Sequence, residues 1–390
     1  MRPAGFDASL TPRDASHNAF ACLNESPPSG PRFSSRRWIA VNSTFSPYCP
    51  NAGSFFLYVP QLQRAVYWEI ARTYGLGDRF FAATSSASYP PHQFIVAGDL
   101  SITWPRSGGR VWHLSEDPGY SCFNATPGTH DLSVVGPNVF SIPLTIEGPD
   151  GGCYQRATYG DRLTEANATW RHYSTALPAS KGIFPFDGFS NITAWYRQTI
   201  NLPTAQFRGS TNVLDDASSG QLPNFVWVKP PCVKQSDHPG TGQGKHGPNW
   251  VGSVINAIGK GPNWDSTVIF VIWDDWGGYY DHVVPPAPDA QREELERGVR
   301  IPFLVISPFL AHPGGVVHTQ GHPGSIMRFV DDLYGTKPLT AFDEGAPDLA
   351  RWFDFTRAPR RFVPIAGATG KGNAWDDHWC DGASKIKVDS

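Results

Sequence analysis

Short apolar runs separated by stretches rich in Gly and Pro make up the pattern of this chain. Val268 to Trp273 is an unbroken apolar run of strand length that is rich in β-branched residues. Such a run predicts a strand buried on both faces of a parallel sheet. Leu222 to Lys229 and Ile301 to Ser307 predict further strands. Every apolar run is shorter than the roughly 18 residues that a bilayer requires, so no transmembrane segment is expected.

Helical periodicity predicts several amphipathic helices. In the first of them, Val66, Ile70 and Tyr74 fall on one face, and Gly75 and Gly77 are expected to end the helix. A chain of 390 residues is long enough for one large α/β domain or two ordinary ones. The clearest predicted helices are residues 60–74, 246–260 and Ser325 to Tyr334.

Residues Ser85 to Gly98 place a serine at the start of another helix. Pro90 and Pro91 fit only the first turn of a helix, so this helix begins near them and ends by Gly98. Ser88 then lies at or near the N-cap. It is either a plain capping residue or a hydroxyl at the positive end of the helix dipole, where an alkoxide and a bound phosphate are both favoured.

Two carboxylates, Asp274 and Asp275, directly follow the central apolar run. Ligands gather at the carboxyl ends of strands in open α/β sheets, so this pair is expected to hold a hard cation or a reacting group. The following Gly-Gly pair permits a tight turn that returns Asp281 and His282 to the same edge. The alternative is a strand ended by a solvated acidic turn.

Composition narrows the class of partner and the compartment. The formal net charge of -3 gives no reason to expect nucleic acid as a partner. Six cysteines without a CxxC pair permit disulfides but indicate neither a zinc ribbon nor a redox motif. Five N-x-[ST] sequons suit an exported protein, although no signal peptide follows Met1. Either the protein is cytosolic or the sequence lacks its true N-terminus. The family resemblance described below favours the second, an exported protein, extracellular or periplasmic, whose signal peptide lies outside this sequence.

The segment Trp273 to Pro286, W-D-D-W-G-G-Y-Y-D-H-V-V-P-P, closely resembles the signature of the bacterial phosphoesterase family that includes phospholipases C and acid phosphatases. Further matches run from about residue 5 to residue 358. The resemblance implies an alkaline-phosphatase-like three-layer sandwich with a central, mostly parallel sheet. It also implies one catalytic domain over residues 1–358 and a tail over 359–390. Within the domain, residues 99–215 are expected to be an irregular, lid-like insertion over the active face.

The resemblance also implies roles for individual residues. Ser88 matches the family's nucleophilic Ser or Thr, although Ala87 and residues 91–93 depart from the usual neighbours. Ser88, Asp274 and Asp275 are the expected metal ligands. Gly321 stands where the family usually has an Asp before its histidine. Four histidines are expected to neutralise phosphate charge or to protonate the leaving group: His17, His238, His282 and His322.

The implied activity is metal-dependent hydrolysis of phosphoric esters through a phosphoseryl intermediate. The cation is expected to be divalent calcium, zinc or iron, and the substrate a phospholipid or a soluble monoester. In the family a Glu-Asn pair supplies further metal ligands, and residues 5–7 resemble the stretch that follows that pair. The pair would then fall before Met1, so the alternative is a truncated, impaired homologue that only binds phosphate esters. Sulfate-ester hydrolysis is disfavoured because His92 and Gln93 offer no arginine.

Overall fold

The computed structural model of this chain describes most of residues 65–368 and a few residues before them. The described ranges are 2–3, 57–58, 65–84, 88–103, 110–113, 128–135, 139–146, 154–174, 188–200, 203–231, 235–237, 246–277, 281, 283–286 and 297–368. The helices are α3 (Ala65–Thr73), α4 (Tyr89–Ala97), α5 (Tyr159–Glu165), α6 (Tyr196–Ile200), α7 (Asn212–Ser218), α8 (His246–Lys260), α9 (Pro323–Tyr334) and α10 (Ala341–Glu344). The strands are β1 (Arg2–Pro3), β2 (Leu57–Tyr58), β3 (Gly75–Gly77), β4 (Ser101–Thr103), β5 (Arg110–His113), β6 (Gly128–Val135), β7 (Val139–Ile146), β8 (Trp170–Tyr173), β9 (Phe207–Arg208), β10 (Phe225–Val228), β11 (Ile269–Ile272), β12 (Phe303–Ile306) and β13 (Gly315–Val317).

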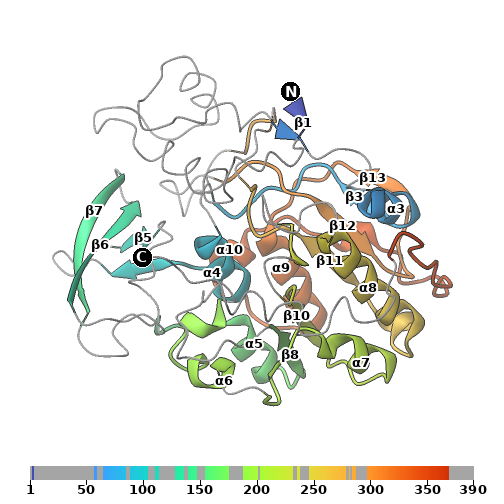
Figure 1. Ribbon diagram of the computed structural model, residues 1–390, viewed down its shortest axis with the longest axis horizontal. Helices are drawn as coiled ribbons and strands as arrows, with labels where there is room; N and C mark the ends of the chain where they lie inside the picture. Colours follow the sequence, from blue (N-terminus) through green and yellow to red (C-terminus); the bar gives the residue numbers. More distant parts are fainter. Residues whose placement is uncertain are drawn as a thin grey trace.

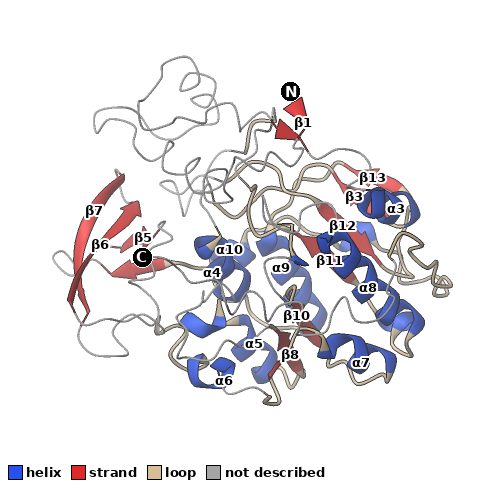
Figure 2. Ribbon diagram, in the orientation of Figure 1, coloured by secondary structure: helices blue, strands red, loops and turns tan. Residues whose placement is uncertain are grey.

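Two sheets form the middle layer of the molecule. One has the strand order β11-β12-β3-β13 and the other β10-β8-β9. The helices α3, α7 and α8 lie on one side of these strands, and α4, α5, α9 and α10 lie on the other (Figure 1, Figure 2). The α/β class and the three-layer arrangement predicted from the sequence are thereby confirmed.

Aromatic side chains fill the space between the layers. The rings of Phe80 and Phe303 stack with centroids 4.1 Å apart, and Phe270 stacks on Phe303 at 5.8 Å. Phe329 of α9 meets Phe270 edge-on at 5.6 Å. Stacked and edge-on pairs of this kind add to the free energy gained by burying the rings themselves. The core therefore joins β11 and β12 to α9, the helix on one face of the sheet.

The structure corrects the predicted pairing of the central strand. Ile269–Ile272 pairs antiparallel with β12, with Ile272 opposite Phe303, and each of its residues is only partly buried. Among the described strands β11 forms an edge of its sheet, which explains the partial exposure. Parallel pairing is found instead in β10-β8-β9 and between β13 and β3. An apolar run predicts burial, but it carries no information about the direction of its neighbour.

The glycines after α3 do more than end that helix. Gly75–Gly77 is strand β3, paired antiparallel with β12 and parallel with β13. A Cβ on Gly77 would lie 2.7 Å from the ring of Phe303, and one on Gly75 would lie 3.0 Å from the ring of Trp352. Both positions lack a side chain because aromatic rings pack directly on the strand.

The prediction that residues 99–215 are irregular is wrong where the structure describes them. Strands β4, β5, β6 and β7 form an antiparallel sheet, with β6 and β7 paired from Gly128–Ile146 to Val135–Val139. Figure 1 shows it at one end of the molecule, beyond α4. Strands β8 and β9 belong to the middle layer. Hairpin strands stabilise each other across the pair, which propensity along a single strand does not reveal. The lid role stays a prediction.

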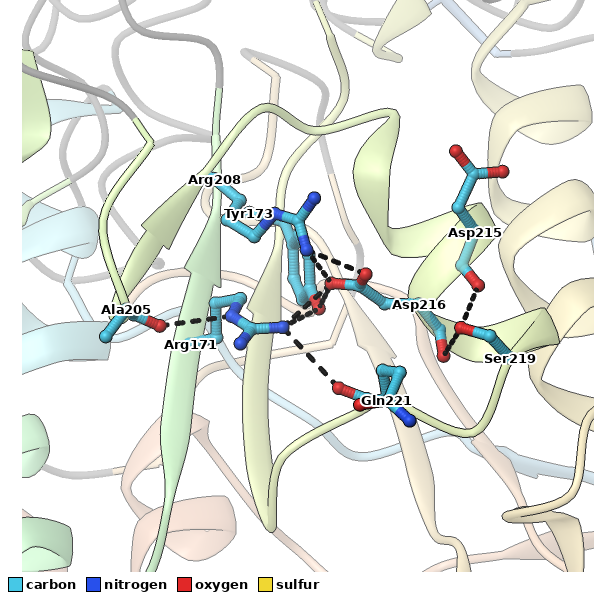
Figure 3. A network of polar contacts seen from close by, with 8 residues as sticks. All are labelled: Arg171, Tyr173, Ala205, Arg208, Asp215, Asp216, Ser219 and Gln221. Carbon is cyan, nitrogen blue, oxygen red and sulfur yellow. Dashed lines mark hydrogen bonds and ion pairs between the residues drawn. The ribbon is translucent and has the colours of Figure 1, made fainter.

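A polar network ties β8, β9 and α7 together (Figure 3). Asp216 accepts hydrogen bonds from Arg171 Nη1 at 2.7 Å, from Arg208 Nη1 at 2.8 Å and from the Tyr173 hydroxyl at 2.6 Å. Burial, together with the bond to Asp216, raises the pKa of Tyr173 to about 12. Two guanidinium groups thus compensate one buried carboxylate, which is the condition under which a buried charge is tolerated.

Candidate active site

Ser88 stands at the N-cap of α4, but its hydroxyl does not cap the helix. Its backbone is helical (φ -62°, ψ -36°) and its side chain makes no capping hydrogen bond. A capping oxygen accepts from the second or third N–H of a helix, and those positions are Pro90 and Pro91, which have none. Ser88 Oγ donates instead to Asp275 Oδ2 at 2.8 Å. Ser88 is therefore not a plain capping residue, and its catalytic role stays a prediction.

The two prolines also change the expectation for phosphate. A helix N-terminus binds anions through its exposed N–H groups, and Pro90 and Pro91 remove two of these from the first turn of α4. The next residue, His92, donates its N–H to the Ser88 carbonyl at 3.3 Å. The charge that would hold a phosphate at Ser88 therefore has to come largely from groups outside this turn.

Asp274 and Asp275 follow β11 and form a crowded pair of like charges. Asp275 Oδ1 accepts from the Gly277 N–H at 2.6 Å, in a turn that Gly277 permits with φ +63°. Burial and, next, the neighbouring charge of Asp274 raise the pKa of Asp275, while the bonds from Gly277 and Ser88 lower it, and the net result is a pKa of about 7. A carboxyl with this pKa exchanges a proton readily near neutral pH.

His92 lies within this cluster, although no motif in the sequence assigned it a role. Its Nδ1 is 2.7 Å from the Ser88 carbonyl oxygen and 3.5 Å from Asp274 Oδ2. The ring is mostly buried, with 13% of the side chain exposed. One signal could have found it: residues four apart lie on the same face of a helix, so His92 had to share a face with Ser88.

The predicted return of Asp281 to this edge of the sheet is confirmed, but its carboxylate is held by an arginine. Arg300, just before β12, donates to Asp281 through Nε at 2.7 Å and Nη2 at 2.9 Å, and through Nη1 to the Asp78 carbonyl at 2.9 Å. His318 Nδ1 lies 2.8 Å from Asp78 Oδ2. The bidentate pair of Arg300 and Asp281 fixes the geometry of the edge that carries Asp274 and Asp275, whereas His318, which contacts Asp78, is largely exposed.

His322 is the N-cap of α9. Its Nδ1 accepts from the Gly324 N–H at 3.2 Å, and its Nε2 lies 3.1 Å from Arg297 Nη2. Its ring lies 4.8 Å from that of Phe342, which in turn lies 4.8 Å from Phe94 of α4. These contacts anchor His322 between α9 and α4. A guanidinium only donates and a neutral imidazole accepts at one nitrogen only, so the contacts of Nδ1 and Nε2 are not both accepting hydrogen bonds. The predicted role in proton transfer stays a prediction.

A second loop approaches the carboxylate pair through Tyr67 of α3. The Tyr67 hydroxyl donates to Asp237 Oδ2, and its ring meets Trp273 edge-on at 4.9 Å. Burial, followed by the charge of Asp237, raises the pKa of Tyr67 well above its usual value. Because Trp273 precedes Asp274, one tyrosine contacts both acidic loops.

Several sequence predictions fall outside the described residues. Among them are the histidines His17, His238 and His282, and all six cysteines. Within the described part of the chain, no helix is both long and apolar enough to cross a membrane. The predicted export of the protein stays a prediction.

The three predicted metal ligands are brought to one place, and their chemistry suits a hard cation. Two carboxylates and a hydroxyl are oxygen donors. The crowding that raises the pKa of Asp275 is the situation that a bound cation relieves. Among the described residues, no group of three or more His, Cys, Asp or Glu side chains is arranged to hold a metal ion. Ser88, Asp274 and Asp275 supply only part of the ligands a hard cation takes, and as oxygen donors they fit that part of a coordination sphere.

This chain is similar in sequence to phospholipases C from plants and bacteria. Non-specific phospholipase C1 of Arabidopsis thaliana is 28% identical over 326 residues, which cover 77% of this chain and 52% of that protein. Non-hemolytic phospholipase C of Pseudomonas aeruginosa is 29% identical over 243 residues, which cover 53% and 34%. Among solved structures, an alkaline phosphatase superfamily protein from Vibrio parahaemolyticus matches with a TM-score of 0.39 and 10% identity, over 87% of this chain and 79% of its own.

The chain spans between a third and about half of the length of these phospholipase relatives. The model of one family matches residues 9–337 of this chain. That range includes Ser88, Asp274 and Asp275 together with the histidines predicted from the sequence. This chain belongs to the Phosphoesterase family.

Proposed function

We propose that this protein hydrolyses phosphoric esters with Ser88 as the nucleophile. The observation that carries the proposal is the 2.8 Å hydrogen bond from Ser88 Oγ to Asp275 Oδ2. The hydroxyl is held beside a carboxylate pair by a helix start that offers it no N–H to cap. A serine next to a group that accepts its proton is the arrangement that activates a nucleophile. Membership of the Phosphoesterase family supports the same class of reaction.

The first step forms a bond between Ser88 Oγ and phosphorus while the ester P–O bond breaks. The hydroxyl proton passes to Asp275, the carboxylate to which Ser88 Oγ already donates. A histidine gives a proton to the departing alkoxide. Water then attacks the phosphoserine, its proton returns to the histidine, and Asp275 returns its proton to Ser88 Oγ as phosphate leaves.

A divalent cation, when bound, supplies Lewis-acid polarisation of a phosphoryl oxygen and lowers the pKa of the serine hydroxyl. Ser88, Asp274 and Asp275 would hold it, and calcium, zinc and iron all remain candidates. The candidates for proton donation and for neutralising phosphate charge are those predicted from the sequence: His17, His238, His282 and His322.

The relatives suggest where to look for the substrate. Several carry the name phospholipase C, which favours the phosphodiester of a phospholipid over a soluble monoester. Two chromogenic substrates separate these possibilities: p-nitrophenylphosphorylcholine for the diester and p-nitrophenyl phosphate for the monoester. We expect the higher kcat/KM with the diester.

Two substitutions test the mechanism. Ser88→Ala and Asp274→Ala should each lower kcat/KM by at least about 10³-fold, because nucleophile and charge stabilisation are both lost. Thermal unfolding should place both variants close to the wild type, and Ser266→Ala, at an exposed serine after α8, serves as the matched control. Substantial activity in either site variant would contradict the mechanism. Phosphate binding without turnover by the wild type would support the impaired-homologue alternative.

A further inference from the structure

The ring of His92 makes two contacts through one nitrogen. Its Nδ1 lies 2.7 Å from the Ser88 carbonyl oxygen and 3.5 Å from Asp274 Oδ2. Carbonyl and carboxylate oxygens only accept hydrogen bonds, so Nδ1 carries a proton in this arrangement. A single N–H therefore points between the backbone of the serine and one member of the carboxylate pair.

We infer that His92 is a positioning residue whose Nδ1–H ties the first turn of α4 to Asp274 and so sets the separation between Ser88 and the carboxylate pair. This inference rests on the proposed function, because it assigns His92 to the same site. His92 acts through its neighbours, so it is distinct from the nucleophile and from the residues proposed as metal ligands.

The first turn of α4 has fewer backbone N–H groups than an ordinary helix start with which to hold its position. Pro90 and Pro91 remove two backbone donors that could have anchored it. The other contact described between this turn and the acidic loop is the bond from Ser88 Oγ to Asp275. That bond is broken in the reaction, when Ser88 Oγ gives up its proton and binds phosphorus. The His92 contacts involve no reacting atom, so they persist through the covalent step.

The contact is also suited to orienting Asp274. The side chain of His92 is 13% exposed and that of Asp274 33% exposed, so water competes with this pair less than with a surface pair. Carboxylates that ligate metals are themselves held by hydrogen bonds, and loss of such a partner typically weakens metal binding by about 10–100-fold. The effect of His92 should therefore appear in cation affinity as well as in turnover.

Two substitutions of His92 distinguish a role of Nδ1 from a role of Nε2. The amide nitrogen of Asn reaches the position of histidine Nδ1, whereas that of Gln reaches the position of Nε2. We expect His92→Asn to bind calcium or zinc within about threefold of the wild type and His92→Gln to bind about 10–100-fold more weakly. Gln is the better helix former of the two, so a purely helical role for residue 92 predicts the opposite order.

The measurement is calorimetric titration of the chelator-treated full chain with calcium alone and with zinc alone. Thermal unfolding without metal tests that each variant is folded. His318 provides the matched control: it contacts an aspartate, Asp78, at the same edge of the sheet but is not placed at the site. His318→Asn and His318→Gln should leave both affinities unchanged.

The outcomes are distinct. The order wild type, Asn, then Gln supports the inference. The reverse order of Asn and Gln, equal affinities, or equal losses in both overturn it. If Asp274→Ala binds cation as the wild type does, the proposed site fails instead. If the wild type binds neither cation, the same order is read in kcat for p-nitrophenyl phosphate, where Asn above Gln supports the inference and Gln equal to or above Asn overturns it.

Discussion

Two aspartates, Asp216 and Asp275, accept several hydrogen bonds and yet have opposite surroundings. Asp216 is 5% exposed and is bonded to two guanidinium groups and a phenol. Asp275 is bonded to a serine hydroxyl and a backbone N–H and lies next to another carboxylate. In the first network opposite charges compensate each other, and in the second like charges repel. Compensated charge braces a fold, whereas uncompensated charge is available for binding and chemistry.

The largest effect on stability should come from the compensated network. Asp216→Asn removes the carboxylate between Arg171 and Arg208 and leaves two guanidinium groups without it. We expect the free energy of unfolding to fall by about 3 kcal/mol, the lower end for a broken buried pair, because both arginines are partly exposed. Urea unfolding measures this. Asp215→Asn, at the exposed neighbouring position, should change it by less than about 0.5 kcal/mol.

The same change from aspartate to asparagine at the candidate site should raise the free energy of unfolding instead of lowering it. In metal-free protein at pH 8, Asp275→Asn removes one of two like charges that lie close together. We expect the free energy of unfolding to rise by about 1–2 kcal/mol, below the roughly 4 kcal/mol of the full pKa displacement, because Asp274 is 33% exposed and the bonds to Asp275 are altered as well. Hydrolysis by the metal-loaded variant should be lost. Asp265→Asn, at an exposed aspartate before β11, is the control. A loss of stability like that at Asp216 would make Asp275 a structural residue.

A third buried aspartate sharpens the comparison through its pH dependence. Burial is the main cause that raises the pKa of Asp331 to about 7. A hydrogen bond to Asp343 and the negative charge of Asp343 also raise it, whereas the hydrogen bond from Thr336 lowers it. The folded state then holds a proton that the unfolded state has lost, so this contribution is complete below about pH 4 and is lost as the pH rises to about 7. Asp331→Asn should reduce the change in the free energy of unfolding between pH 4 and 8, measured by urea unfolding, by at least about 1 kcal/mol of the roughly 4 kcal/mol that a displacement from 3.8 to about 7 allows. Asp332→Asn, an exposed neighbour whose charge makes the smallest contribution to this shift, should keep most of it.

The smallest effect on kcat and stability is expected at Tyr67, which packs beside the candidate site without belonging to it. Tyr67→Phe loses the bond to Asp237 but keeps the ring against Trp273. We expect kcat to fall about threefold and the free energy of unfolding by less than about 1 kcal/mol. Tyr74→Phe, on the same side of the sheet, loses its bonds to Val363 and should lower stability without changing kcat. Equal effects on kcat would show that Tyr67 has no special link to the site.

Local chemistry made much of the fold predictable. The helix expected over 246–260 is α8, and the one expected over Ser325 to Tyr334 is α9, which begins two residues earlier. The predicted end of α4 at Gly98 is confirmed by its left-handed φ of +63°. In each case the signal is a period, a proline or a glycine within a few residues of the element, which is where sequence patterns are informative.

Pairing and packing were not predictable in the same way. The antiparallel partner of β11, the sheet formed by β4 to β7 and the strand at Gly75–Gly77 all depend on residues far apart in the chain. At the site, the place of His92 beside Asp274 depends on how α4 meets β11, more than 180 positions later. The order of residues in a single sequence does not reveal which of these distant segments come into contact.

What the sequence alone determined is the set of local elements and the candidates Ser88, Asp274 and Asp275, because helix starts, buried runs and adjacent carboxylates are short-range features. What only the tertiary structure decided is that the Ser88 hydroxyl faces Asp275, that Asp281 is held by Arg300, and that His92 joins the cluster. The physical reason is that a hydrogen bond depends on atoms lying within about 3 Å of each other, and folding brings these residues together from distant parts of the chain.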